Sequence, residues 1–220
     1  MRKLFKPLFI IGLISFIFLF ASCDGEVKMN LYTTDLLEAM ETEEIVYVKT
    51  SMIVEGMSES YDYKFLEDLI PSFSNPHYVE YDYQTSLAFD IKIPIIKKSS
   101  LENFDHSGNL FEVIGVQTKS GYSFYFNINR ILINQINSYT TSTMYQSFKL
   151  SDFDFSYDLI NDCKDIKSYK IYSSYVNNNA YPMSHSFELE RRDSKTIKLS
   201  EVLSKSLEQD EKTYFLTIDK

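Results

Sequence analysis

The segment from Leu87 to Ile95 alternates between apolar and polar side chains, and this pattern constrains the fold more than any other in the chain. Every second residue of the segment is apolar: Leu87, Phe89, Ile91, Ile93 and Ile95. Asp90 and Lys92 stand between them. Because successive side chains of a β-strand point to opposite faces, the pattern predicts a strand with one buried face. Pro94 has no backbone N–H, so we expect this strand to lie at a sheet edge or to carry a bulge.

Strand patterns outnumber helix patterns in the rest of the chain. Further strands are predicted at residues 45–54, 110–118, 122–129, 151–158, 168–176, 185–190, 196–199 and 214–218. Helices are predicted at residues 36–43, 131–139 and 200–208, and from Ser60 to Leu69. No β–α–β rhythm appears. The sequence therefore predicts an α+β fold, with one strand-rich domain on an antiparallel, sandwich-like sheet and a few short helices.

The composition is that of a folded chain. Of its 220 residues, 44% are hydrophobic and 15% aromatic, and only 6 are Gly and 5 are Pro, which excludes a disordered or fibrous protein. The formal net charge is −9, and no basic tract is present. Nucleic-acid binding is therefore not expected, because phosphate contacts need clustered Lys and Arg. No linker composition divides residues 31–220, so we expect a single domain there.

The N-terminus has the layout of an export signal. Residues 1–22 begin with the basic residues Arg2, Lys3 and Lys6 and continue with an apolar run of 14 residues from Leu8 to Ala21. That run is shorter than the roughly 18–20 residues that a membrane-spanning helix needs. We therefore expect a cleaved signal peptide at residues 1–22, with an uncleaved signal anchor as the alternative.

Cys23 is the one residue to which the sequence assigns a modification. Phe20-Ala21-Ser22-Cys23 resembles the lipobox of bacterial lipoproteins, in which the cysteine becomes the acylated N-terminus. This resemblance implies a membrane anchor, with membrane lipid as the partner of acylated Cys23. The alternative is an ordinary signal followed by a chance cysteine. Asp24 resembles the signal that keeps lipoproteins in the inner membrane of Gram-negative cells, where they face the periplasm; the outer membrane is the second possibility.

The chain that remains after processing is strongly acidic. It holds 19 basic and 31 acidic residues, a net charge of −12, because three basic residues lie in the signal. This charge repels an anionic leaflet and leaves the lipid as the main attachment. Residues 23–30 are interpreted as a lipidated tether with a reach of roughly 25 Å. Cys163 loses its only possible intrachain partner when Cys23 is acylated. A lone exported thiol can form an intermolecular bridge or act as a reactive group, but we expect Cys163 to be buried and inert.

The search for catalytic and metal-binding motifs assigns no catalytic residue, metal ligand or cofactor. No phosphate-binding glycine loop, zinc motif or nucleophile elbow occurs. The three histidines, His77, His106 and His185, lie far apart in the sequence. Three carboxylates on one strand face are the best candidate for a cation site: Asp152, Asp154 and Asp158. A solvated strand face produces the same pattern, and this is the plainer interpretation.

Short motifs stand near both ends of the mature chain. The motifs near the start are Cys23, Val27-Lys28-Met29-Asn30-Leu31 and Thr34-Asp35-Leu36-Leu37. Those near the end are Ser173-Ser174-Tyr175-Val176, Ala180-Tyr181-Pro182 and Thr196-Ile197-Lys198-Leu199-Ser200-Glu201-Val202. Together they resemble a group of small, uncharacterised lipoproteins of enterobacteria and their phages. The resemblance implies no reaction and carries over one residue, the acylated Cys23.

These observations together favour a membrane-anchored, non-enzymatic binding module at the cell envelope. Its expected partner is an envelope protein that the sequence does not identify. The 17 Tyr and 17 Phe residues suit a binding surface, although aromatic residues also fill strands. The first alternative is a protein that binds a small ligand in an aromatic cleft. The second is an enzyme that uses acids such as Asp152 and Asp154.

Overall fold

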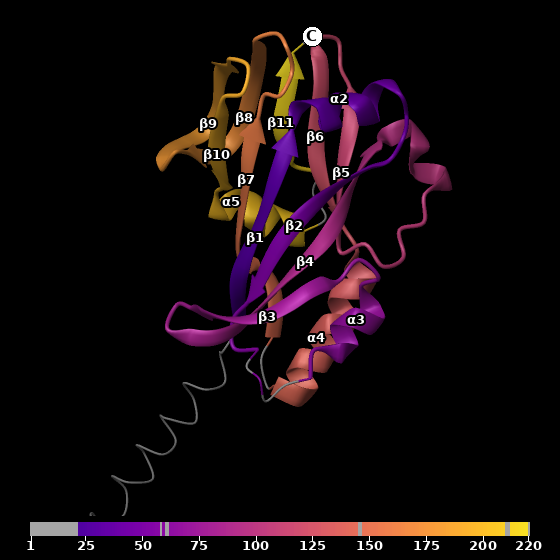
Figure 1. The fold of residues 1–220 in the computed structure, drawn as a ribbon, viewed down its shortest axis with the longest axis vertical. Helices are drawn as coiled ribbons and strands as arrows, with labels where there is room; N and C mark the ends of the chain where they lie inside the picture. Colours follow the sequence, from indigo (N-terminus) through magenta and orange to yellow (C-terminus); the bar gives the residue numbers. More distant parts are fainter. Residues whose placement is uncertain (1–21, 58, 60–61, 145–146, 210–211, 220) are drawn as a thin grey trace, which may run out of the picture.

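The computed structural model describes residues 22–57, 59, 62–144, 147–209 and 212–219 (Figure 1). The predicted signal peptide of residues 1–22 therefore lies outside the described residues, apart from its last residue. Within them the chain forms strands β1 (Ser22–Tyr32), β2 (Val46–Val54), β3 (Ser74–Tyr81), β4 (Gln84–Lys97), β5 (Phe111–Gln117), β6 (Gly121–Ile128), β7 (Ser147–Ile160), β8 (Lys167–Val176), β9 (Asn179–Leu189), β10 (Ser194–Leu199) and β11 (Tyr214–Asp219). The helices are α2 (Thr33–Glu41), α3 (Lys64–Leu69), the 3₁₀ helix η2 (Lys98–Asn103), α4 (Arg130–Met144) and α5 (Glu201–Glu208).

The strands of the described residues join into one sheet that curls round until it meets itself. Its order is β10-β7-β1-β2-β4-β5-β6-β11-β8-β9, and β10 pairs with β8 as well as with β7. The pairing from β7 round to β8 is thereby closed, while β9 and β3 lie outside the ring. Most neighbours are antiparallel, but β1–β7 and β4–β5 are parallel. The predicted strand-rich α+β domain with a few short helices is confirmed, and its opposing layers are parts of one sheet.

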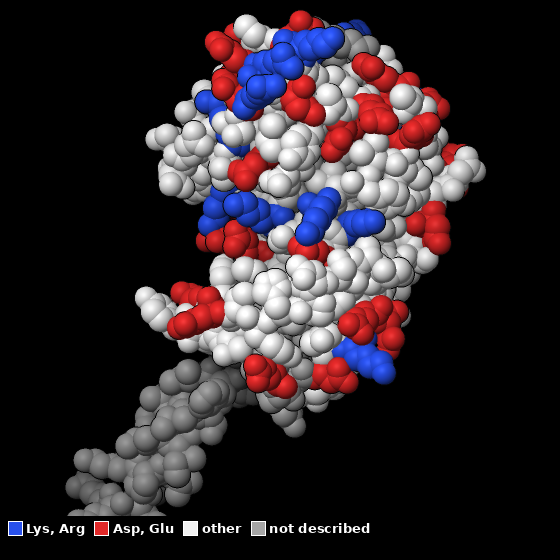
Figure 2. Space-filling view, viewed as in Figure 1, with Lys and Arg blue, Asp and Glu red and all other residues white. Residues whose placement is uncertain are grey.

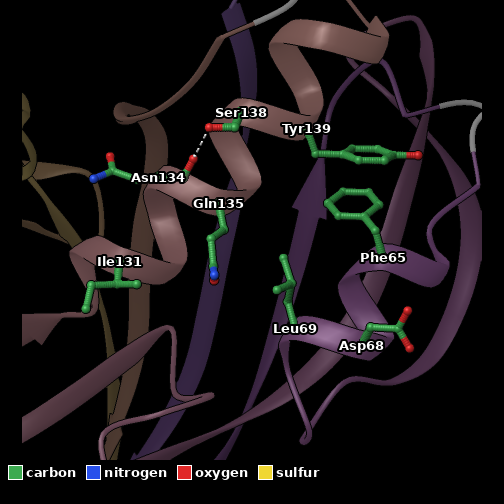
Figure 3. A pocket seen from close by; sticks show the side chains of 8 residues that line it. All are labelled: Phe65, Asp68, Leu69, Ile131, Asn134, Gln135, Ser138 and Tyr139. Atoms are coloured by element: carbon green, nitrogen blue, oxygen red, sulfur yellow. Dashed lines mark hydrogen bonds between the residues drawn. The ribbon is translucent and has the colours of Figure 1, made fainter.

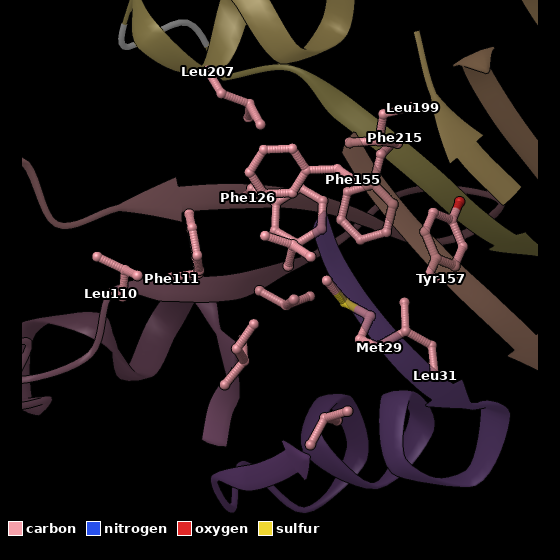
Figure 4. Packing of buried hydrophobic residues seen from close by; sticks show 14 of the residues in the cluster. Met29, Leu31, Leu110, Phe111, Phe126, Phe155, Tyr157, Leu199, Leu207 and Phe215 are labelled. Atoms are coloured by element: carbon pink, nitrogen blue, oxygen red, sulfur yellow. The ribbon is translucent and has the colours of Figure 1, made fainter. Parts of the chain in front are cut away.

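The hydrophobic core fills the inside of this ring (Figure 4). Phe126 stacks on Phe215 with ring centroids 4.3 Å apart, and Phe111 meets Phe155 edge to face at 5.5 Å. Phe155 and Tyr157 point inward from β7, as the alternation in residues 151–158 predicts. Opposite walls of the sheet thus bury each other's aromatic side chains, and this burial is the main favourable contribution to folding.

The strand with the clearest alternation lies in the interior of the sheet, so the prediction of an edge position from Pro94 is wrong. β2 pairs along its whole length with residues 87–95 of β4, including Tyr47 opposite Pro94. On its other side β4 pairs with β3 as far as Asp90 and with β5 from Ile95 onward. Pro94 falls in the gap between these two partners. The absence of its N–H therefore removes no hydrogen bond from the ladder on that side.

The segment interpreted as a tether is part of the folded body. Residues 24–30 lie in β1, which pairs antiparallel with β2 and parallel with β7. Val27 is fully buried and Met29 is 2% exposed. The expectation of a free spacer at residues 23–30 is therefore wrong. Val27, Met29 and Leu31 alternate with polar residues and contribute to the core as any inner strand does.

Candidate functional site

The start of β1 fixes where Cys23 lies on the molecule. The backbone of Cys23 pairs with Phe148 at the start of β7, and Gly25 pairs with Val54 at the end of β2. Two residues of extended chain span only about 7 Å. Any group attached at Cys23 would therefore be held close to this end of the sheet.

The same end of the molecule carries α3 and α4. Helix α4 ends at Met144, and β7 begins at Ser147 beside Ser22. Figure 1 shows α3, α4 and β3 gathered at this end. In the same view, Figure 2 shows a band of Lys and Arg across the middle of the face and a broad uncharged area below it, with Asp and Glu toward its margins. The lower part of this face therefore has an uncharged centre and charged margins.

An apolar groove of about 630 Å³ runs between α3 and α4 (Figure 3). Its floor and walls include the stacked rings of Phe65 and Tyr139, whose centroids lie 3.6 Å apart at an interplanar angle of 19°. Leu69 is half-buried beside them, and Ile131 is 75% exposed. Single exposed apolar side chains are ordinary, but a contiguous group of them is typical of a binding surface.

Polar side chains also line this groove. All of the lining residues belong to α3 and α4, as Figure 3 shows. Asp68 comes from α3, and Asn134, Gln135 and Ser138 come from α4. The Ser138 hydroxyl donates to the backbone carbonyl oxygen of Asn134 at 2.8 Å. The lining offers apolar contact with hydrogen bonds at its edge, an arrangement that suits binding.

The predicted stripe of carboxylates on β7 is largely paired with side chains of neighbouring strands. Asp154 accepts a hydrogen bond from the Lys198 ammonium at 2.6 Å, and Asp158 accepts one from the Thr196 hydroxyl at 2.5 Å. Lys28 of β1 lies 3.8 Å from Asp158 as well. Among the described residues no three His, Cys, Asp or Glu side chains converge closely enough to hold a metal ion. The stripe divides instead, with Asp152 and Asp154 lining a polar pocket and Asp158 lying outside it.

One of the three histidines contacts a buried carboxylate. His106 Nδ1 lies 2.7 and 2.9 Å from the two carboxylate oxygens of Glu112, which is 1% exposed. The Asn127 amide donates to the same carboxylate at 2.7 Å. His77 is exposed on β3, and His185 stacks on Tyr181 with ring centroids 3.8 Å apart. The structure therefore does not bring the histidines together.

The His106–Glu112 pair fastens a covering loop to the sheet. Glu112 faces the same side of β5 as Ile114, where a small second cluster packs beneath η2 and Phe104. The His106 ring meets Phe104 edge to face at 5.1 Å. The sequence analysis does not predict this contact between His106 and Glu112. Its only signal is a glutamate between two apolar residues of a strand that the sequence predicts.

One protein family covers most of the chain, including the elements that form the groove. A family model described as a domain of unknown function, DUF7424, matches residues 25–220. The chain belongs to the DUF7424 family. The matched region begins at Gly25 within β1 and runs to the end of the chain, so the α3–α4 groove lies within the DUF7424 domain, as does the polar pocket apart from Asp24. No curated protein and no solved structure matches.

Two further features of the DUF7424 domain bear on the sequence predictions. Cys163 is half-buried, which corrects the expectation of a buried cysteine, and burial raises the pKa of its thiol. A raised pKa keeps the thiol protonated and weakens it as a nucleophile. Among the described residues, none of the helices combines the length and apolarity that crossing a bilayer requires.

Proposed function

We propose that this chain is a bacterial lipoprotein, acylated at Cys23, whose folded body is a non-enzymatic binding module at the cell envelope. The observation that carries the proposal is that Cys23 and the apolar α3–α4 groove share one end of the molecule. The lipobox resemblance supports acylation, and the position of Cys23 at the start of β1 would hold the body against the membrane. The groove would then open close to the bilayer, where envelope proteins are within reach.

The shape of the groove favours a protein as its partner. Only two helices bound it, so a small ligand would stay largely exposed, whereas small-molecule pockets bury most of the ligand surface. An apolar side chain of another protein would cover Ile131 and contact Phe65 and Leu69. Aromatic and aliphatic anchors with a polar rim are the usual composition of such interfaces. The proposed partner is an envelope protein that presents such side chains.

A small apolar ligand is the second candidate. The volume of about 630 Å³ lies within the usual range for ligand sites, and the Phe65–Tyr139 stack offers a flat surface for a ring. An enzyme that uses the acidic residues has less support, because Asp154 and Asp158 are paired with Lys198 and Thr196.

Loss of the Cys23 thiol is expected to release the protein from the membrane. In cells fed a labelled fatty acid, the wild type should carry the label and sediment with membranes in high salt. The Cys23→Ser variant should carry no label and should be soluble, because the charge of the body provides no attraction to an anionic leaflet. Cys163→Ser is the matched control and should behave as the wild type. An unlabelled wild type, or a Cys23→Ser variant that stays on membranes, would contradict acylation.

A charge placed in the groove is expected to abolish partner binding. In-cell crosslinking of the wild type should capture one dominant envelope protein, and Ile131→Glu should reduce this capture by at least about tenfold, because an unpaired charge in an apolar contact costs more than 1.4 kcal/mol. Val202→Glu is the control, since Val202 is 73% exposed on α5, outside the groove. Equal capture by both variants would place the interface elsewhere. Capture of nothing by any variant, with an apolar ligand bound, would favour the second candidate.

A further inference from the structure

The turn between β3 and β4 carries the most exposed large apolar side chain of the described residues. Tyr83 is 94% exposed and forms a two-residue turn with Asp82, between the paired residues Tyr81 and Gln84. Both turn residues have positive φ, 47° at Asp82 and 66° at Tyr83. Turns of this kind favour asparagine and glycine, and a bulky aromatic residue is unfavourable there. An exposed tyrosine that is held in this conformation points to a function.

The strand register places this turn beside Cys23. Gly25 of β1 pairs with Val54 of β2, and Val54 pairs with Leu87 of β4, so the three residues form one row across the sheet. Both pairings are antiparallel, and β1 and β4 therefore run in the same direction, about 10 Å apart with β2 between them. Cys23 and the turn thus leave this row on the same side. Figure 1 shows the β3–β4 hairpin projecting from the sheet beside the start of β1.

The turn extends further from this row than Cys23 does. Cys23 lies two residues before Gly25 in β1, which stays extended there although β7 bulges at this point. Tyr83 lies four residues before Leu87. At about 3.3 Å per residue, Tyr83 projects roughly 7 Å beyond Cys23. The headgroup layer on each side of the hydrocarbon core of a bilayer is about 5–8 Å thick. The turn can therefore reach through this layer when Cys23 lies at its outer boundary.

A hydrogen bond and shared charges support this placement. The Glu55 N–H donates to the Asp24 carbonyl oxygen at 2.8 Å. Burial, and after it the charges of Asp24 and Asp82, raise the pKa of the Glu55 carboxyl. The carboxylate next to Cys23 and the carboxylate of the turn thus act on the same group. Carboxylates at this end of the sheet repel anionic lipid and are compatible with zwitterionic headgroups, which carry an ammonium group.

We propose that the β3–β4 turn is a second membrane contact, in which the Tyr83 ring enters the headgroup layer of a bilayer of zwitterionic phospholipids. Tyrosine suits this layer because its ring is apolar while its hydroxyl stays hydrated. The inference rests on the proposed function, since it requires the start of β1 to be held at a membrane. Contacts at both Cys23 and Tyr83 would fix the orientation of the folded body, whereas the anchor alone would let it rotate.

Fluorescence from a single tryptophan tests this contact, because the chain contains no Trp. The full-length Tyr83→Trp variant is purified from membranes in a mild detergent and reconstituted into phosphatidylcholine vesicles. We expect its emission to shift to shorter wavelength, and to lose most of its intensity when the lipid is brominated in the upper part of its acyl chains. Tyr47→Trp is the matched control and should show neither change. Tyr47 is 52% exposed and lies seven residues along β2 from Val54, about 23 Å away.

The charge of the lipid provides a second readout. Phosphatidylglycerol mixed into the vesicles should weaken the quenching of Tyr83→Trp at low salt, because an anionic surface repels the carboxylates beside the turn. Added NaCl should restore the quenching, since salt screens this repulsion. Quenching that grows with the share of phosphatidylglycerol would contradict contact with a zwitterionic surface.

Acylation is measured on the same preparation with the labelled fatty acid, so the contact and the anchor can fail separately. Quenching without label would support the contact and contradict acylation, because uncleaved residues 1–22 would then hold the protein. Label without quenching would overturn the contact and keep the anchor. Equal quenching of Tyr83→Trp and Tyr47→Trp would show that the body has no fixed orientation, and would overturn the contact as well. An unquenched turn that crosslinks to another protein or to a second copy would be a protein interface instead.

Discussion

Replacement of Gly25 by alanine is expected to lower the free energy of unfolding by about 3 kcal/mol. A Cβ atom at this position would lie 2.1 Å from the carbonyl oxygen of Ile53 and 2.6 Å from Cε1 of Phe153. The first of these atoms belongs to the backbone of β2, which pairs with β1 at this point. Relief of the clash requires β1 and β2 to separate where β7 already departs from regular pairing. Urea denaturation of the wild type and the variant measures the effect.

Gly115→Ala is the matched control for this prediction. A Cβ atom on Gly115 would also come within 2.1 Å of another atom, but that atom is the sulfur of Met40, at the flexible end of a side chain on α2. Methionine adapts readily to a changed cavity, so we expect a cost of about 1 kcal/mol. A loss at Gly25 no larger than the loss at Gly115 would show that β1 and β2 are not held as closely as the structure places them.

Gly25 also illustrates what the sequence could and could not predict about the fold. The sequence predicts the elements with strong local patterns, including the strands that correspond to β5 and β6 and the helix after Ser200, whose hydroxyl accepts from the Leu203 N–H. β1 has the same kind of alternation at Val27, Met29 and Leu31. Because β1 follows the lipobox, the sequence nevertheless favours a tether there. Its role as an inner strand depends on partners more than 100 residues away in β7.

Two other differences between the predicted and the observed fold have the same physical origin. β3 contains Asn75, Pro76 and His77, which have little local preference for a strand, and it forms because β4 offers a free edge. Pro94 indicates an edge in a typical sheet, but β4 has two successive partners on one side and the proline lies between them. Tertiary pairing decided both cases, and local propensity carries no information about it.

The candidate sites were harder to predict than the fold. The stripe of Asp152, Asp154 and Asp158 was found, but its division by Lys198 and by the bulge in β7 depends on which strands become neighbours. The α3–α4 groove brings together Phe65 and Tyr139, two residues that are 74 positions apart in the sequence. Alternation and helical spacing describe one element at a time. A site formed by side chains of several elements therefore cannot be recognised from these patterns.

Removal of the His106 imidazole is expected to lower the free energy of unfolding by about 3 kcal/mol. The Glu112 carboxylate is almost completely buried, and His106→Ala would leave it with the Asn127 amide as its remaining side-chain donor. A buried carboxylate that loses a hydrogen-bonding partner is costly, because folding has removed most of its contact with water. The contact with Phe104 would be lost as well. We therefore expect the loop of residues 98–110 to exchange its amide hydrogens faster than in the wild type.

A double-mutant cycle separates the charge from the packing. Glu112→Gln keeps the size of the side chain and removes its charge, so adding it to His106→Ala should restore about 1–2 kcal/mol. His77→Ala is the control: this ring is exposed and its Nδ1 lies 2.9 Å from the Asn75 carbonyl oxygen, so its removal should cost less than about 0.5 kcal/mol. If Glu112→Gln added its own loss to that of His106→Ala, the two side chains would be independent. A gain on adding it would show that the histidine fastens the covering loop because it compensates a buried charge.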